Sequence, residues 1–243
     1  HPDNPQARAL GQVATILRDG GLIAYPTDSG YALGCMLGNR AGLDRIRALR
    51  QLDARHNFTL VCSEFAQLGH YVQMGNDVFR AIKAATPGGF TFILQATREA
   101  PRVMLQPKRR TVGVRIPDHV TALALLNELG EPLMSSTLLL PGHDEPMSDG
   151  WTVNDEIGHA LDAVLDSGDC GTEPTTVIDL TGDEVEIIRR GSGDPELFEA
   201  ERLVGRAIRD GRLDEQLSAW LEPLGLAIGF RPLDVAPSVS ANL

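Results

Sequence analysis

The sequence predicts an α/β fold in which helices cover a mixed β-sheet, within one domain over 1–195. Stretches with helical spacing of apolar residues alternate with short apolar runs along most of that range. The chain has 243 residues, of which 42% are hydrophobic. A chain of this length buries on the order of 70% of the surface that its unfolded form exposes. It therefore needs neither disulfides nor a structural metal to stabilise its core.

The first elements are a helix, a strand and a turn. Apolar residues recur at helical spacing over 5–18, and Gly20 can end this helix in the left-handed conformation. The apolar run 22–28 predicts a buried strand that ends near Pro26, because proline cannot donate a hydrogen bond to a neighbouring strand. The polar turn 26–31 follows this strand.

The alternation continues to about residue 190. Asparagine can cap a helix at its first turn, and apolar residues at helical spacing follow Asn39, Asn76 and Asn154. Pro87 and Gly130 can end helices. The predicted helices span 39–52, 76–89, 120–129 and 154–168, and the predicted strands span 58–62, 90–96, 111–117 and 133–140, with two more in 175–190.

The end of the chain has a different character. Over 196–221 the apolar residues follow helical spacing alone, and the last twenty or so residues are rich in proline, glycine and serine. We therefore predict a domain over 1–195 and a C-terminal helical appendage and tail over 196–243.

Charge is unevenly distributed. The formal net charge is -11, which argues against a general nucleic-acid coat, yet 40–55 and 98–115 hold 11 of the 22 basic residues. If these two segments fold together, they form a positive site that could receive a phosphate or a carboxylate.

The cysteines and the hydropathy predict a cytoplasmic protein. Cys35, Cys62 and Cys170 are far apart in the sequence and odd in number, which suits free thiols in a reducing compartment. No apolar stretch approaches the roughly 20 residues needed to cross a bilayer, and the first segment lacks a signal pattern. We expect no membrane association.

Two strand ends carry residues suited to an anion. In the turn 26–31, hydroxyl and backbone N–H groups could converge beyond a strand end, although turn chemistry alone favours a simple Asx or Ser turn. Arg115 ends another predicted strand, where a guanidinium can bind a carboxylate or phosphate in a bidentate manner or form a surface ion pair.

Later segments could bind a nucleotide. Thr175 and Thr176 supply hydroxyl groups, and Arg189 precedes a short glycine-containing loop. No Walker A motif or G-x-S-x-G motif is present, so neither a P-loop NTPase nor a typical serine hydrolase is indicated. His143 and His159 lack a recognised zinc spacing, and we predict no metal site.

Several segments together resemble the YrdC/YciO family, whose better-known members are threonylcarbamoyl-adenylate synthases, and are most similar to its YciO branch. The similarity lies in GLIAYPTDSGYALGC (21–35), TPGGFTFIL (86–94), VGVRIPDH (112–119), PTTVIDL (174–180) and RRG (189–191). The resemblance implies an open, twisted mixed sheet with helices around it and a large concave groove. It also implies that threonine, bicarbonate and ATP react to give threonylcarbamoyl-AMP, an intermediate in tRNA modification.

By this resemblance, certain residues would line the groove. They are Thr27, Ser29, Tyr31, Arg50, Arg115 and Thr137 for a small carboxylate or other anion, and Thr175, Thr176 and Arg189 for the nucleotide. ATP would be a substrate accompanied by Mg²⁺, with no tightly bound cofactor. The family's synthases carry K-x-R and S-x-N motifs, whose positions here fall on Arg50 and Leu52, and on Thr137 and Leu139.

These observations leave three functional hypotheses. The first is an enzyme or former enzyme that binds ATP or AMP and an L-threonine-like carboxylate, with weak or altered threonylcarbamoyl-AMP synthase activity. The second is a non-catalytic protein of the same fold that binds tRNA or double-stranded RNA through 40–55 and 98–115. The third is carbamoyl transfer as in hydrogenase-maturation proteins, against which the lack of zinc-finger cysteines counts.

Overall fold

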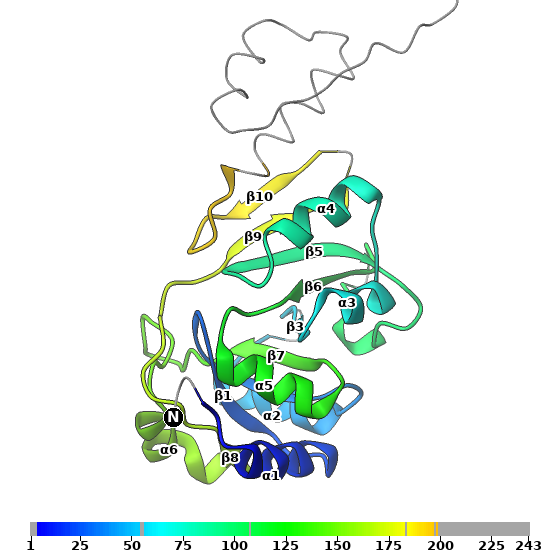
Figure 1. Cartoon of the computed structure of the whole chain (residues 1–243). Coiled ribbons are helices and arrows are strands. Elements are labelled where there is room, and N and C mark those ends of the chain that lie inside the picture. The colour runs from blue at the N-terminus through cyan, green and yellow to red at the C-terminus, as the bar shows by residue number, and fades with distance from the viewer. Residues whose placement is uncertain (1–3, 54–55, 107, 183, 197, 199–243) are drawn as a thin grey trace, which may run out of the picture. The chain divides into compact units, whose positions relative to one another are not determined.

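A computed structural model describes residues 4–53, 56–106, 108–182, 184–196 and 198 of the chain. Its strands form one mixed sheet of ten strands, in the order β10-β9-β5-β6-β3-β7-β2-β1-β8, with β4 paired to β5 (Figure 1). The strands are β1 Ile23–Thr27, β2 Gly30–Met36, β3 Thr59–Val61, β4 Val72–Gln73, β5 Phe90–Ala96, β6 Thr111–Arg115, β7 Leu133–Thr137, β8 Ala163–Val164, β9 Thr176–Asp179 and β10 Glu186–Arg189. The predicted mixed α/β class is confirmed.

Strand directions explain why the sheet is mixed. β3 pairs with β6, β5 with β9 and β1 with β8 in parallel, whereas the other pairs are antiparallel. The α-helices are α1 Ala7–Arg18, α2 Arg40–Arg50, α3 Phe65–Tyr71, α4 Asn76–Ala84, α5 Val120–Leu129 and α6 Gly150–Ile157, and short 3-10 turns lie at Arg102–Met104 and Gly158–Ala160. None of the helices in the part of the chain described here is long and apolar enough to span a membrane.

The helices pack on two faces of the sheet, and strand alternation decides which residues they meet. Ile23 and Tyr25 of β1 belong to a buried cluster with residues of α1 and α5, which lie beside each other (Figure 1). Leu22 and Ala24 point the other way, into the larger cluster that also holds Leu43 of α2. Successive side chains of a strand face opposite sides, so one short segment contributes to both layers.

The sequence prediction missed several elements. β2 follows the turn at once, but its small and polar residues Gly30, Gly34 and Cys35 hid the strand. α3, β4 and β8 are also additional, and each has seven residues or fewer. Short elements show too few repeats of their period to be recognised from sequence alone.

Two predicted helix N-caps are wrong. Gly75, not Asn76, is the N-cap of α4, and no side chain caps that helix. α6 begins earlier than predicted, because the Asp149 carboxylate accepts a hydrogen bond from the Thr152 N–H at 2.8 Å. The chain beyond residue 157 then forms a 3-10 turn and β8 instead of continuing the helix.

Other predicted helix ends are confirmed. The Asn39 side chain accepts from the Gly42 N–H at 2.8 Å, and Gly130 ends α5 with φ of 71°. The helices predicted over 196–221 lie almost entirely outside the described residues, and the division at residue 195 stays a prediction.

Candidate functional site

A cavity of about 990 Å³ lies against one face of the central strands. Along the central strands, side chains face the cavity and the core in turn. Thr59, Gly113 and Ser135 are register partners on three adjacent strands and line the cavity. The residues that follow Thr59 and Gly113, Leu60 and Val114, are buried on the opposite face. The period of two therefore gives these strands one apolar face for packing and one polar face that is free to meet a ligand.

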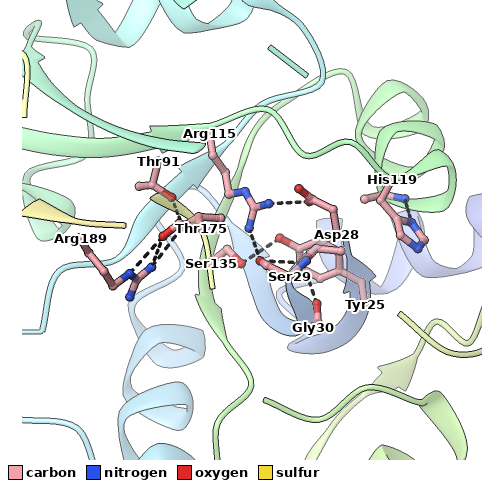
Figure 2. Close-up of polar contacts among 12 residues, drawn as sticks. Tyr25, Asp28, Ser29, Gly30, Thr91, Arg115, His119, Ser135, Thr175 and Arg189 are labelled. Carbon is pink, nitrogen blue, oxygen red and sulfur yellow. Dashed lines mark hydrogen bonds and ion pairs between the residues drawn. The ribbon is translucent and has the colours of Figure 1, made fainter. Parts of the chain in front are cut away.

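Arg115, at the end of β6, is the most deeply buried cation of this cavity. It is 7% exposed, its Nη1 donates to Ser29 Oγ at 2.8 Å, and its Nη2 lies 2.5 Å from Asp28 Oδ1 (Figure 2). Its Nε is buried and has no hydrogen-bond partner among the described residues. A guanidinium this deeply buried at a cavity wall favours an anion in the adjoining space.

The β1–β2 turn holds Arg115 in place. The Thr27 hydroxyl donates to the Gly30 carbonyl at 2.6 Å and accepts from the Ser29 N–H at 3.1 Å. Gly30 has φ of +97°, a conformation that side-chain-bearing residues rarely adopt. The Ser turn considered from the sequence is therefore present, and it also presents Ser29 and Asp28 to Arg115.

A second arginine approaches the same cavity from β10. Arg189 donates through Nε and Nη2 to the Thr175 carbonyl, at 3.1 and 2.8 Å, and Thr175 Oγ1 lies 2.9 Å from Thr91 Oγ1 (Figure 2). Burial lowers the pKa of Arg189, and the charge of Arg115 lowers it further. Two guanidinium groups that repel each other gain stability when an anion lies between them.

A third arginine lies at the other end of the cavity. Arg50, the last residue of α2, donates through Nε to the Leu139 carbonyl at 3.1 Å and through Nη1 to Ser136 Oγ. The same Ser136 Oγ lies 3.0 Å from His56 Nε2. Burial lowers the pKa of both Arg50 and His56. Residues from α2, the following loop and β7 therefore meet at one oxygen.

The structure places the nine residues selected from the sequence in two groups. Thr27, Arg50, Arg115, Thr137, Thr175 and Arg189 line the cavity. The others lie outside its lining. Ser29 holds Arg115 from behind, the Tyr31 hydroxyl donates to Asp166 at 3.3 Å, and Thr176 Oγ1 donates to the Gly193 carbonyl at 2.5 Å.

Sequence reasoning missed other lining residues. Tyr25 is fully buried, its hydroxyl lies 2.8 Å from Ser135 Oγ, and burial raises its pKa to about 12. His56 and Ser136 were also missed, because they are 80 positions apart and only the fold brings them together. The run of three polar residues at the end of β7, Ser135 to Thr137, was the available signal for Ser136.

The predicted local positive charge is only partly realised. Arg45 pairs with Asp162 at 2.5 Å and Arg47 pairs with Asp44 at 2.8 Å, so these α2 arginines are used within the protein. The described lining contains four arginines and four carboxylates, namely Arg50, Arg109, Arg115, Arg189, Asp144, Glu145, Glu173 and Asp179. The cavity wall is therefore mixed in charge.

The acidic residues and histidines near the cavity are the groups that could bind a metal ion or act as a base. Within the described ranges, no three His, Cys, Asp or Glu side chains are grouped so as to hold a metal ion. His119 is the N-cap of α5, where its Nδ1 accepts from the Ala122 N–H at 3.4 Å (Figure 2). That acceptor role keeps the imidazole at the start of the helix.

Comparison with known families gives a match over most of the chain. The Sua5, YciO and YrdC family model, described as telomere recombination, matches residues 15–191. An uncharacterized protein of Haemophilus influenzae is 49% identical over 199 residues, which cover 82% of this chain and 96% of that protein. A threonylcarbamoyl-AMP synthase of Vibrio vulnificus is 29% identical, over 64% of this chain and 84% of that protein.

Solved structures agree with these matches. The crystal structure of Escherichia coli YciO is similar with a TM-score of 0.78 and 47% identity, over 82% of this chain and 96% of that chain. The Sua5 protein of P. abyssi, solved in complex with L-threonine, has a TM-score of 0.71 and 25% identity, over 76% of this chain and 55% of that chain.

Proposed function

Because the chain belongs to the Sua5/YciO/YrdC family, we propose that it binds a nucleotide and a small carboxylate such as L-threonine in the cavity on its central strands. The nucleotide is ATP or AMP, and the chemistry is a weak or altered form of threonylcarbamoyl-AMP synthesis, linked to tRNA modification. The family relation and the L-threonine complex of the P. abyssi relative support a role of this kind.

The observation that carries the proposal is the buried Arg115. Its Nη groups are held by Asp28 and Ser29, while its Nε has no acceptor among the described residues. Arg189 enters the same cavity. A carboxylate or phosphate beside these two arginines would reduce the repulsion between their charges.

Mg²⁺ would enter with the phosphates of ATP. The described residues provide no three-ligand cage, and Mg²⁺ commonly keeps several waters and binds substrate phosphates with one or two protein carboxylates. Asp144 or Glu145 of the cavity wall could supply such a carboxylate. When bound, Mg²⁺ would neutralise phosphate charge.

The motif positions decide how strong the synthase activity is. Arg50 donates to the Leu139 carbonyl, so the positions of the K-x-R and S-x-N motifs are in contact. Leu52, the second K-x-R position, packs against the main core cluster. Each lost polar group in a preorganised site is commonly worth about 2–4 kcal/mol of transition-state stabilisation. We therefore expect only slow formation of threonylcarbamoyl-AMP by the unaltered chain.

The test follows pyrophosphate and threonylcarbamoyl-AMP from ATP, Mg²⁺, L-threonine and bicarbonate. Leu139→Asn should raise the rate at least tenfold, while Leu52→Arg should also destabilise the fold, because it replaces a partly buried apolar side chain. Calorimetry with AMP and with L-threonine measures binding separately from turnover. Absence of binding for both ligands would refute the proposal.

RNA binding is the second candidate, and it now depends on one segment. Arg98, Arg102, Lys108 and Arg110 are exposed, whereas Arg45 and Arg47 of α2 are paired with carboxylates. If the exposed group binds RNA phosphates, affinity for double-stranded RNA should fall steeply between about 50 and 200 mM salt. An affinity that does not change with salt would exclude this candidate.

A further inference from the structure

A serine, a histidine and an arginine share one oxygen at the end of the cavity near α2. Ser136 Oγ lies 3.0 Å from His56 Nε2 and also accepts a hydrogen bond from Arg50 Nη1. Arg50 is held in turn by the Leu139 carbonyl at 3.1 Å. All three side chains belong to residues that line the cavity.

The partners of Ser136 Oγ leave His56 as the neighbouring side chain that can accept its proton. Arginine has donors and no acceptor, so the hydroxyl of Ser136 cannot donate to Arg50. His56 Nε2 lies within hydrogen-bond distance and can accept this proton in the tautomer that carries the ring proton on Nδ1. Burial and the nearby charge of Arg50 lower the pKa of His56, so the imidazole is neutral at neutral pH and able to accept.

The adjacent serine shows that this arrangement is specific to Ser136. Ser135 Oγ donates to the Leu33 carbonyl at 2.9 Å and lies 2.8 Å from the Tyr25 hydroxyl. Neither of these partners is a base at neutral pH, since burial raises the pKa of Tyr25 to about 12. Ser136 alone of the pair therefore has both a base and a cation at its hydroxyl.

We propose that Ser136 is a nucleophile, His56 its general base and Arg50 the cation that stabilises the developing alkoxide, in the hydrolysis of an activated carbamoyl or acyl group. A hydroxyl next to an adjacent base is the usual arrangement for an activated serine. The substrate class is a mixed anhydride between a carbamate or carboxylate and a phosphate. This proposal rests on the proposed function, which brings a nucleotide phosphate and a carboxylate into the same cavity.

The two steps balance as follows. Ser136 Oγ bonds to the carbonyl carbon while its proton moves to His56 Nε2, and the bond from that carbon to the phosphate oxygen breaks, so that the phosphate leaves with the electron pair. His56 releases that proton to solvent and then takes one from the water that attacks the carbonyl carbon of the seryl intermediate. As the carbon–Oγ bond breaks, His56 returns this proton to Ser136 Oγ, and the released acid loses its own proton to solvent. The products are a free phosphate monoester, such as AMP, and the released carbamate or carboxylate.

Covalent labelling tests the nucleophile without requiring nucleotide binding. The full chain is incubated with 4-nitrophenyl dimethylcarbamate, release of 4-nitrophenolate is followed, and the modified residue is located by peptide mass spectrometry. We expect the carbamoyl group on Ser136. His56→Gln should slow labelling by about 10²–10⁴-fold, the usual contribution of a positioned general base. Ser63→Ala and His70→Gln, which change residues outside the lining, should label like the unaltered chain.

The pH profile distinguishes a base from a structural histidine. The labelling rate should decrease as the pH is lowered, with a midpoint below pH 6.5, because burial and Arg50 lower the pKa of His56. The other charged groups that act on His56 are Asp53, which raises its pKa, and Arg47, which lowers it. A merely structural role for His56 would leave the profile flat over this range.

Two outcomes overturn the proposal. One is an unlabelled Ser136 in a folded chain, and the other is an equal labelling rate in the His56→Gln variant. AMP binding is measured by calorimetry on the same samples, so failure of the nucleotide site is seen separately. Circular dichroism confirms that each variant folds. If the chain binds AMP but Ser136 is not labelled, the proposed function stands and the roles of Ser136 and His56 as nucleophile and base are refuted.

Discussion

The Arg115–Asp28 pair gives the sharpest stability prediction. Arg115→Met removes the guanidinium and leaves the Asp28 carboxylate, whose side chain is 16% exposed, without its 2.5 Å partner. Removing one member of a buried pair commonly costs about 3–5 kcal/mol, because the remaining charge is uncompensated. Asp28 keeps some contact with water, so we expect a loss near 3 kcal/mol.

A double-mutant cycle isolates the charge effect. Asp28→Asn combined with Arg115→Met removes the uncompensated carboxylate, so the double variant should be more stable than Arg115→Met alone. Urea unfolding followed by circular dichroism measures each free energy at pH 7. A loss below about 1 kcal/mol for Arg115→Met, or strict additivity of the two changes, would refute this reasoning. By removing a charge-assisted hydrogen bond worth about 1.5–3 kcal/mol, Arg115→Met should also weaken AMP or L-threonine binding about 10–150-fold.

Three further predictions concern the turn, a helix cap and a buried hydroxyl. Gly30→Ala should reduce the free energy of unfolding in urea by about 1–3 kcal/mol, because φ is +97° and the new Cβ would lie 2.6 Å from a proline carbon. Gly38→Ala is the control and should lose less, because φ is +82° but no atom lies within 4 Å of the new Cβ. Because the pKa of His119 is lowered, its contribution to stability is complete above about pH 6.5 and is lost as the pH falls toward the lowered value. His119→Asn should therefore reduce the pH dependence of the free energy of unfolding between about pH 7 and 5. Tyr25→Phe removes a buried hydrogen bond and should cost about 0.5–1.5 kcal/mol, and a thermal melt unchanged from that of the unaltered chain would contradict this.

The sequence indicated most of the fold because its apolar periods are strong. Strands such as β5 and the helix α5 carry enough repeats of their period to be recognised within a residue or two of their observed bounds. β2 was missed because Gly30 follows the turn directly, and turn chemistry and strand pattern overlap there. The start of α6 was misplaced because an asparagine four residues after Gly150 was an equally acceptable cap by type.

The site was harder to predict because its contacts are long-range. Arg115, Thr175 and Arg189 were selected from sequence, and the structure brings them to one cavity. Their partners could not be predicted, since Asp28 meets Arg115 across 87 positions and Ser136 meets His56 across 80. A residue type at a strand end suggests an anion site, but only the strand order decides which ends converge.

In β3, β6 and β7, side chains on one face pack in the core and side chains on the other face line the cavity. Residues such as Leu60, Val114 and Met134 face the apolar side and hold the sheet against its core. Thr59, one position away, faces the cavity, where a change of side chain alters ligand contacts and leaves that core intact. Thr137 and Leu139 line the cavity, so substitutions at these two motif positions can redirect its chemistry at little cost to the fold. Leu52 packs against the core and Arg50 is held by the Leu139 carbonyl and Ser136, so these two positions also contribute to stability.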